Sequence, residues 1–271
     1  MHIKINRDNL YSKKATTIRV SKFQFTFLFK KTQMTHFNLF SKIFFNICLF
    51  FGIISFCSTS EAQITTNKQL SKEELKTIFT TERKANLGIH YPIFRVYTYS
   101  DSEGKFYIVL AENPSKTENG KDASNKIQET YIKYKNGNYT KIFETNDQLR
   151  ANQYESSIWF WTKHIALEDY DGDGIADPIL AYGSFGLNNF DDGRIHFIIH
   201  YKGEKIMIHH QNSPMDDERN TKVDDAFYIL PSKIQNKVKE IMSNMEQNEQ
   251  AIFPAGWIEA MGNKKLYFDE N

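Results

Sequence analysis

The sequence predicts an α+β protein made mainly of antiparallel β-hairpins, with a short helix near the start of the folded part and an amphipathic helix near its end. Short apolar runs separated by turn residues recur between positions 89 and 210, which is the pattern of consecutive hairpins. Residues 232–247 carry apolar side chains at helical spacing. Strands in succession followed by a helix predict one α+β domain, residues 63–271. Within it lies one aspartate-rich loop, residues 169–177.

The region before this domain is typical of an export signal. Residues 43–57 form an apolar run shorter than the ~20 residues that span a bilayer. Small residues at 60–62 suit cleavage before Gln63. A signal that begins at Met34 and covers 34–62 has an ordinary length. We therefore predict that residues 1–33 come from an over-extended gene start.

An alternative at this end of the chain is lipidation of Cys57. Phe56 stands where that processing requires a small residue, so cleavage to a soluble exported form is preferred. We expect the mature chain to lie in the periplasm, on the cell surface or outside the cell. We expect no transmembrane helix in it, and a monomer.

Export changes the charge balance. The whole sequence has 34 basic and 33 acidic residues, and residues 1–62 hold nine and two of them. The mature chain then has 25 basic and 31 acidic residues, a net charge near −6. Nucleic-acid binding needs a basic face, so we exclude that class of partner. Both cysteines, Cys48 and Cys57, precede residue 63, so no disulfide is expected in the mature chain.

The mature chain begins with a predicted helix and a hairpin. Ser71 and Glu74 have the spacing of a capping box, which predicts a helix over 71–80. Residues 91–99 alternate apolar and polar side chains. Residues 101–104 then form a turn, and a second strand covers 106–111.

Further hairpins follow a polar loop predicted at 113–125. The strands 130–134 and 139–143 flank Asn136-Gly137, the strongest short signal for a hairpin. Another pair, 194–201 and 205–210, flanks a turn at 202–204. With the two strands around the aspartate-rich loop, we expect about eight strands, followed by the helix at 232–247.

The aspartate-rich loop has the spacing of a calcium site. Calcium loops supply oxygen ligands from positions 1, 3, 5, 7 and 9, the seventh being a backbone carbonyl, with glycine at position 6. Gly174 occupies that sixth position. The predicted Ca²⁺ ligands are Asp169, Asp171, Asp173, the carbonyl of Ile175, and Asp177.

The flanks of this loop argue against a helix–loop–helix calcium hand. Such a hand needs a glutamate at position 12, where this chain has Leu180. Residues 157–167 and 178–183 are rich in apolar and β-branched residues, so we predict strand–calcium loop–strand. Asp191 and Asp192 are candidates to complete the site. The alternative is a solvated acidic turn without metal, because Asp and Gly dominate turns.

In this form the loop resembles the calcium loops of integrin-type β-propeller blades (FG-GAP-like loops), with their Asp-x-Asp-x-Asp-Gly-x-x-Asp pattern. The resemblance implies metal ligation by the four aspartates of 169–177. It covers this segment alone. A propeller needs several blades, and the sequence has one copy, so no propeller is expected.

Histidines and tryptophans form two further candidate sites. His196, His200 and the pair His209-His210 lie on neighbouring predicted strands, where three imidazoles could converge on zinc; surface or hydrogen-bonded histidines are the preferred reading. Trp159 and Trp161 project to one face of a strand and could stack on a sugar ring. Core packing is the preferred role for them.

Hydrolytic chemistry has no sequence signature here, since the chain lacks the serine-hydrolase elbow, the zinc-protease motif and the phosphate loop. Acidic residues that could act in pairs on a glycosidic bond are too numerous to discriminate. They are Glu155, Glu168, Asp216, Asp217 and Glu218.

Several segments of residues 155–265 together resemble a family of exported bacterial proteins of surface-polysaccharide biosynthesis. They are 157–163 (SIWFWTK), 169–177, Gly183 with 191–194 (DDGR), 210–212 (HQN), 219–221 (RNT), 227–231 (FYILP), and 251–254 (AIFP) with Trp257. The resemblance implies a role in making or displaying cell-surface glycan such as lipopolysaccharide.

The function expected from the sequence is therefore that of an exported calcium-binding accessory protein in surface-polysaccharide biosynthesis or display. Its expected partners are the polysaccharide or envelope proteins. Two alternatives stay open: a glycan hydrolase with structural calcium, and an extracellular binding module for glycan or protein. An enzyme is the less favoured class.

Overall fold

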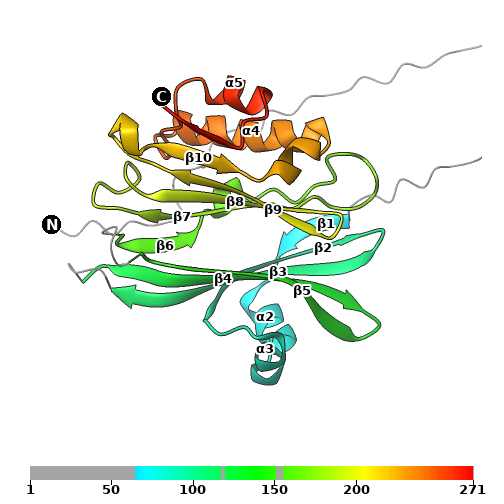
Figure 1. Cartoon of the computed structure of the whole chain (residues 1–271). Coiled ribbons are helices and arrows are strands. Elements are labelled where there is room, and N and C mark those ends of the chain that lie inside the picture. Colours follow the sequence, from blue (N-terminus) through cyan, green and yellow to red (C-terminus); the bar gives the residue numbers. More distant parts are fainter. Residues whose placement is uncertain (1–64, 117–119, 151–154, 271) are drawn as a thin grey trace, which may run out of the picture. The chain divides into compact units, whose positions relative to one another are not determined.

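The computed structural model describes residues 65–116, 120–150 and 155–270. The predicted gene-start extension, the predicted signal and Cys57 lie outside these residues. All described residues belong to one unit, residues 60–271. Within them, eleven strands form two antiparallel sheets accompanied by four α-helices (Figure 1). In this described part, no helix combines the length and the apolar character needed to cross a membrane.

The first sheet has the strand order β1-β2-β3-β4-β5, and every neighbouring pair is antiparallel. Its strands are β1 (Thr65–Gln69), β2 (Ile93–Asp101), β3 (Gly104–Lys116), β4 (Asp122–Lys135) and β5 (Asn138–Gln148). Both predicted hairpins are confirmed. Asn136 and Gly137 have φ of 53° and 83°, as a two-residue hairpin turn between twisted strands requires.

The predicted polar loop at 113–125 is wrong over most of its length. β3 continues to Lys116 and β4 begins at Asp122, because the two strands pair with each other through this polar stretch. A register shift next to Pro114 accommodates the residue that cannot donate to the ladder. Asn113 Nδ2 donates to Asn125 Oδ1 across the pair (2.8 Å).

The second sheet has the strand order β11-β10-β9-β8-β7-β6. Its strands are β6 (Ser157–Phe160), β7 (Ile179–Phe185), β8 (Arg194–Tyr201), β9 (Glu204–Gln211), β10 (Asn220–Val223) and β11 (Tyr267–Asp269). The count of about eight strands is too low for the described residues, because the short strands β1, β10 and β11 were not predicted. Each of them is only three to five residues long and gains its order from the strand beside it.

Helices cover the outer face of each sheet. α2 (Lys72–Ile78) has the predicted capping box between Ser71 and Glu74. It ends earlier than predicted because Thr80 caps a separate helix, α3 (Thr81–Leu87). α4 (Ser232–Gln247) has the predicted bounds. α5 (Trp257–Gly262) was not predicted and follows it.

The elements stack in four layers: α2 and α3, the first sheet, the second sheet, and α4 with α5 (Figure 1). Between the sheets, Ile108 and Ile127 of the first pack with Leu180 and Ile198 of the second. Because the second sheet is covered on both faces, β7 and β8 are buried almost throughout. This explains why apolar residues predominate in both strands.

Candidate metal centre

The aspartate-rich loop projects from a closed neck. Ala166 and Ile179 form an antiparallel bridge with N–H···O distances of 2.9 and 2.8 Å. The Asp177 N–H donates to the Glu168 carbonyl at 2.8 Å. The residues between are therefore held at both ends by backbone hydrogen bonds. The loop leads directly into β7, so the predicted strand after it is present. The strand before it, β6, is short, and the 3₁₀ turn η1 (Thr162–His164) separates it from the loop.

Asp169, Asp171 and Asp177 each bring a carboxylate oxygen to one point, and these oxygen atoms lie within 4.8 Å of one another. Asp177 is only 1% exposed. Its burial, together with the charges of Asp171 and Asp169, raises the pKa of this carboxyl to about 7, although the Tyr170 N–H donates to it. Like charges so close destabilise the site unless something balances them. The arrangement can therefore accept a divalent cation.

Backbone amides fix the orientation of the first carboxylate. Asp169 accepts hydrogen bonds from the N–H groups of Gly172 (2.6 Å), Asp173 (3.2 Å) and Gly174 (2.8 Å). Gly172 and Gly174 have φ of 86° and 84°, in the left-handed region that favours glycine. The two glycines thus let the loop turn back around Asp169.

The predicted ligand Asp173 lies outside the group of three. Its carboxylate lies 2.7 Å from Lys202 Nζ, in the turn between β8 and β9, and also accepts from the Ile175 N–H (2.9 Å). Lys202 is 3.7 Å from Asp171 as well, and the Tyr201 hydroxyl donates to Asp171 (3.0 Å). A cation of the chain itself therefore already partners the fourth aspartate.

The turn between β2 and β3 joins the loop to the first sheet. The Ala176 N–H donates to Asp101 Oδ2 (3.2 Å), and the Ser102 N–H donates to the Gly174 carbonyl (3.0 Å). Asp101 was predicted only as a turn residue. No sequence signal linked it to a loop 75 positions away.

Two other aspartates considered for the site lie apart from it. Asp192 accepts two hydrogen bonds from the Asn188 N–H, at 2.9 and 3.0 Å. This contact closes the loop between β7 and β8, at the opposite end of β7 from the 169–177 loop. Asp191 is exposed in the same loop. Neither belongs to the group of three.

The histidines do not converge as a zinc site would require. His196 and His209 meet, with their Nδ1 atoms 2.7 Å apart. His200 instead lies between the sheets with Nε2 3.2 Å from Glu129, and His210 bonds to Asn212 (2.7 Å). Among the described residues, the only group of three or more potential metal-binding side chains is that of Asp169, Asp171 and Asp177.

The two tryptophans belong to an aromatic cluster. Trp161 is 5% exposed and packs against Gly183, where a Cβ would lie 2.6 Å from its ring. Trp159 is half-buried, with its ring centroid 4.4 Å from that of Phe185. Phe190 closes the cluster at 5.2 Å from Trp161. Trp161 therefore has little surface to offer a sugar, whereas Trp159 keeps part of its ring accessible.

Most of the acidic residues considered for catalysis have partners within the chain. The Arg194 guanidinium donates to Glu155 and to Asp147 (2.8 Å). Burial alone would raise the pKa of Glu155, but the hydrogen bonds and charge of Arg194 lower it below its ordinary value. Asp216 pairs with Arg219 (2.9 Å), and Glu218 accepts from the Ser213 hydroxyl (3.0 Å). Glu168 and Asp217 are exposed.

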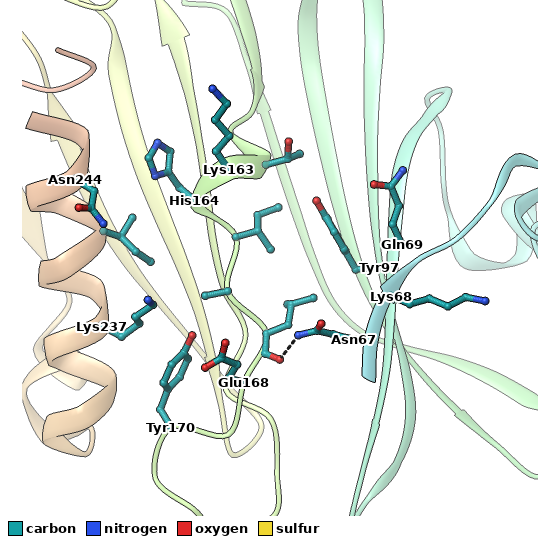
Figure 2. A pocket seen from close by; sticks show the side chains of 15 residues that line it. Asn67, Lys68, Gln69, Tyr97, Lys163, His164, Glu168, Tyr170, Lys237 and Asn244 are labelled. Atoms are coloured by element: carbon teal, nitrogen blue, oxygen red, sulfur yellow. Dashed lines mark hydrogen bonds between the residues drawn. The ribbon is translucent and has the colours of Figure 1, made fainter. Parts of the chain in front are cut away.

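A cavity of about 340 Å³ adjoins the first residues of the loop. Figure 2 shows Glu168 and Tyr170 between Lys237 of α4 on one side and Asn67 and Tyr97 of the first sheet on the other. Asn67 Nδ2 donates to the Leu167 carbonyl (2.8 Å). The Tyr170 hydroxyl is buried and has no hydrogen-bond partner among the described residues. The wall of this cavity is thus continuous with the metal-ligand loop.

A second cavity, of about 640 Å³, lies beside the Arg194 network and is lined by polar side chains from β8, β9 and β10. Comparison with known proteins gives no relative to interpret either cavity: no family model, no curated protein and no solved structure matches the chain.

Proposed function

We propose that the protein binds one calcium ion in the 169–177 loop, and that the ion stabilises an exported accessory protein of cell-surface polysaccharide biosynthesis or display. The observation that carries the proposal is the meeting of three carboxylates within 4.8 Å, one of them buried. In this arrangement a cation would replace mutual repulsion with attraction.

The donor set fits calcium better than other metals. Calcium takes six to eight oxygen ligands, including carboxylates, backbone carbonyls and water. Asp169, Asp171 and Asp177 would supply the carboxylates, and the Ile175 carbonyl of the same loop is placed in sequence to join them. Zinc prefers nitrogen and sulfur, and magnesium rarely uses an all-protein cage. Asp173 would join only by leaving Lys202.

The ion would act on more than the loop, because the loop is bonded to the first sheet. Asp101 and Ser102 contact Ala176 and Gly174, and Ala166 at the neck is bonded to Ile179 of β7 in the second sheet. Calcium bound only to the folded state stabilises it by mass action, about 2.7 kcal/mol at a concentration one hundred times Kd. An extracellular setting provides the calcium that a weak site needs.

The role in surface polysaccharide is supported by the sequence resemblance over residues 155–265 and by the predicted export signal. A binding or accessory role is preferred to hydrolysis because Glu155 is held ionised by Arg194, so it is poorly suited to act as a general acid. Trp159 and the cavity beside the loop are the surfaces that would contact glycan.

Calorimetric titration of calcium into the metal-stripped protein tests the first part. We expect one saturable site with Kd of roughly 10⁻⁶–10⁻³ M and a calcium-dependent rise in melting temperature. Asp171→Ala should abolish that rise, whereas the matched variant Asp191→Ala should retain it. A rise of unchanged size in Asp171→Ala would show that the loop is not the site.

Incubation of the calcium-loaded protein with purified envelope polysaccharide tests the second part. An accessory protein should bind the polysaccharide saturably and release no shorter sugars. Release of reducing ends that stops when one acidic residue outside 169–177 is replaced would instead identify a hydrolase.

A further inference from the structure

The second cavity lies on the face of β8, β9 and β10 that continues the inter-sheet side of the second sheet. Opposed residues of antiparallel neighbours project to the same face, and the register places two rows of polar side chains there. One row is His196, His209 and Lys222. The other is Arg194, Gln211 and Asn220. All six line the cavity.

The hydrogen bonds of the first row determine the proton positions on both histidines. Arg194 Nη1 lies 3.2 Å from His196 Nε2, and a guanidinium can only donate. His196 therefore accepts at Nε2 and, being neutral, carries its proton on Nδ1. That proton is donated to His209 Nδ1 at 2.7 Å. His209 in turn carries its own proton on Nε2.

This chain of bonds leaves an N–H donor at its outer end. His196 is 4% exposed, whereas His209 is only partly buried. Neither His209 Nε2 nor the Lys222 ammonium has a protein partner among the described residues. A protonated ring nitrogen cannot ligate a metal ion, and an adjacent ammonium repels one. The two groups are suited to an anion.

Three of the four acidic residues that line the cavity are bound to other groups, and the fourth, Asp217, is exposed to solvent. Glu155 is held by Arg194, Asp192 by Asn188, and Glu218 by Ser213. The five N–H groups of the Arg194 guanidinium are all used by Glu155, Asp147, the Gln148 carbonyl and His196. It thus orients His196 and does not reach a ligand.

We propose that this cavity binds a small organic molecule through a carboxylate or phosphate group, with His209 Nε2–H and the Lys222 ammonium as the anion-binding donors. A cavity of about 640 Å³ falls in the ~300–1,000 Å³ range of small-molecule sites. In the adjacent row, the side-chain amide nitrogens of Gln211 and Asn220 donate to backbone carbonyls. Their amide oxygens would accept hydrogen bonds from the hydroxyl groups of a sugar acid. The site is separate from the 169–177 loop and needs no metal.

Three separate calorimetric titrations of the full chain, with glucuronate, inorganic phosphate and glucose, test the proposal. We expect glucuronate or phosphate to bind saturably and glucose to bind at least tenfold more weakly. Binding of glucuronate alone would identify a carboxylate ligand, and binding of phosphate alone a phosphate ligand. Two results would overturn the proposal. One is equal affinity for glucose and the anions. The other is no binding of either anion at concentrations up to 20-fold above ~1 mM, which is the upper end of ordinary metabolite affinities.

A variant pair tests the assigned residues. Lys222 is exposed, so Lys222→Gln should fold normally. Because this variant loses a hydrogen bond to a charged group, it should bind the anion about tenfold or more weakly. Lys233→Gln, on an exposed position of α4, is the matched control and should bind as the parent does. Equal affinity in both variants would contradict the site.

The histidine assignment has its own readout. Nitrogen-15 NMR of the imidazole rings in the free protein should show His196 protonated at Nδ1 and His209 at Nε2. The anion should shift the His209 Nε2 resonance more than that of His196. The opposite tautomer of His209 would remove the donor and overturn the proposal.

Discussion

The paired strands β7 and β8 have buried carboxylates near both ends, and the two ends differ in how the charge of these carboxylates is neutralised. At the end where β8 begins, Arg194 is surrounded by Glu155 and Asp147, and the pKa of Glu155 is lowered. At the other end three aspartates meet, and burial raises the pKa of Asp177. At the first end a buried guanidinium lies between the carboxylates, whereas at the second end the neighbouring cation, Lys202, is about half exposed and pairs mainly with Asp173. An acidic cluster without a buried cation of its own is the place where a bound metal ion would change the stability most.

Removal of the internal cation, Arg194, should have the largest effect on stability. In Arg194→Met, Glu155 and Asp147 would lose the guanidinium while Glu155 stays buried, with its side chain 2% exposed. Breaking a buried ion pair from one side costs about 3–5 kcal/mol. We expect a fall of this size in the free energy of unfolding, measured by urea denaturation at pH 7. If the free energy of unfolding fell by less than ~1 kcal/mol, this network would contribute no more to stability than an exposed ion pair does.

Arg194→Lys is the control for that substitution. It keeps the charge but loses the planar fork that reaches two carboxylates and a carbonyl. Its stability should lie between those of the parent and Arg194→Met.

Acidification tests the same end of the sheet through its neutral histidines. Burial lowers the pKa of His210 to about 4, from 6.5. The unfolded chain therefore binds a proton that the folded chain refuses, so stability is lost as pH falls from about 6.5 to 4. Below pH 4 the loss of unfolding free energy from this one group amounts to roughly 3 kcal/mol. His196 and His209, whose pKa values are also lowered by burial, add to the loss with the same sign.

Urea denaturation from pH 7 to pH 4.5 would measure this dependence. His210→Gln removes one titrating group and should flatten the acid limb relative to the parent protein. An acid limb of the same steepness would show that His210 does not titrate as its burial implies.

The smallest expected effect concerns the partner of Asp173. Lys202 is about half exposed, with 48% of its side chain accessible, so Lys202→Met should change the stability of the metal-free protein little. It frees Asp173 to face the ion and removes a competing positive charge. We expect calcium to bind severalfold more tightly by calorimetry, with Lys233→Met as the unchanged control. Weaker calcium binding would mean that Lys202 positions the loop rather than competing with the ion.

Local sequence was enough for the features whose partners are close in the chain. The hairpin at Asn136-Gly137, the capping box at Ser71 and the spacing of the 169–177 loop all lie within a few residues. The stripe of apolar residues likewise placed α4 correctly. These elements depend on backbone conformation and periodicity, which a single segment displays.

Contacts between distant strands could not be inferred in this way. Arg194 reaches Glu155 across 39 positions, and the His196–His209 contact needed the register of β8 and β9. The short strands β10 and β11 have little propensity of their own and form because a neighbouring strand provides their hydrogen bonds. Asp173 was assigned by spacing, whereas Lys202 comes from another turn of the sheet.

The hydrogen bonds from Ser102 and Ala176 have a consequence for how the molecule opens. They connect the β2–β3 turn of the first sheet to the 169–177 loop of the second. The loop therefore holds the two sheets together at this end of the molecule. When the loop loosens, these two amides should exchange with solvent deuterium together, ahead of the strands behind them. A protease acting on the partly opened chain would then begin at this end, and under the calcium binding proposed above its rate of cleavage should fall as the calcium concentration rises.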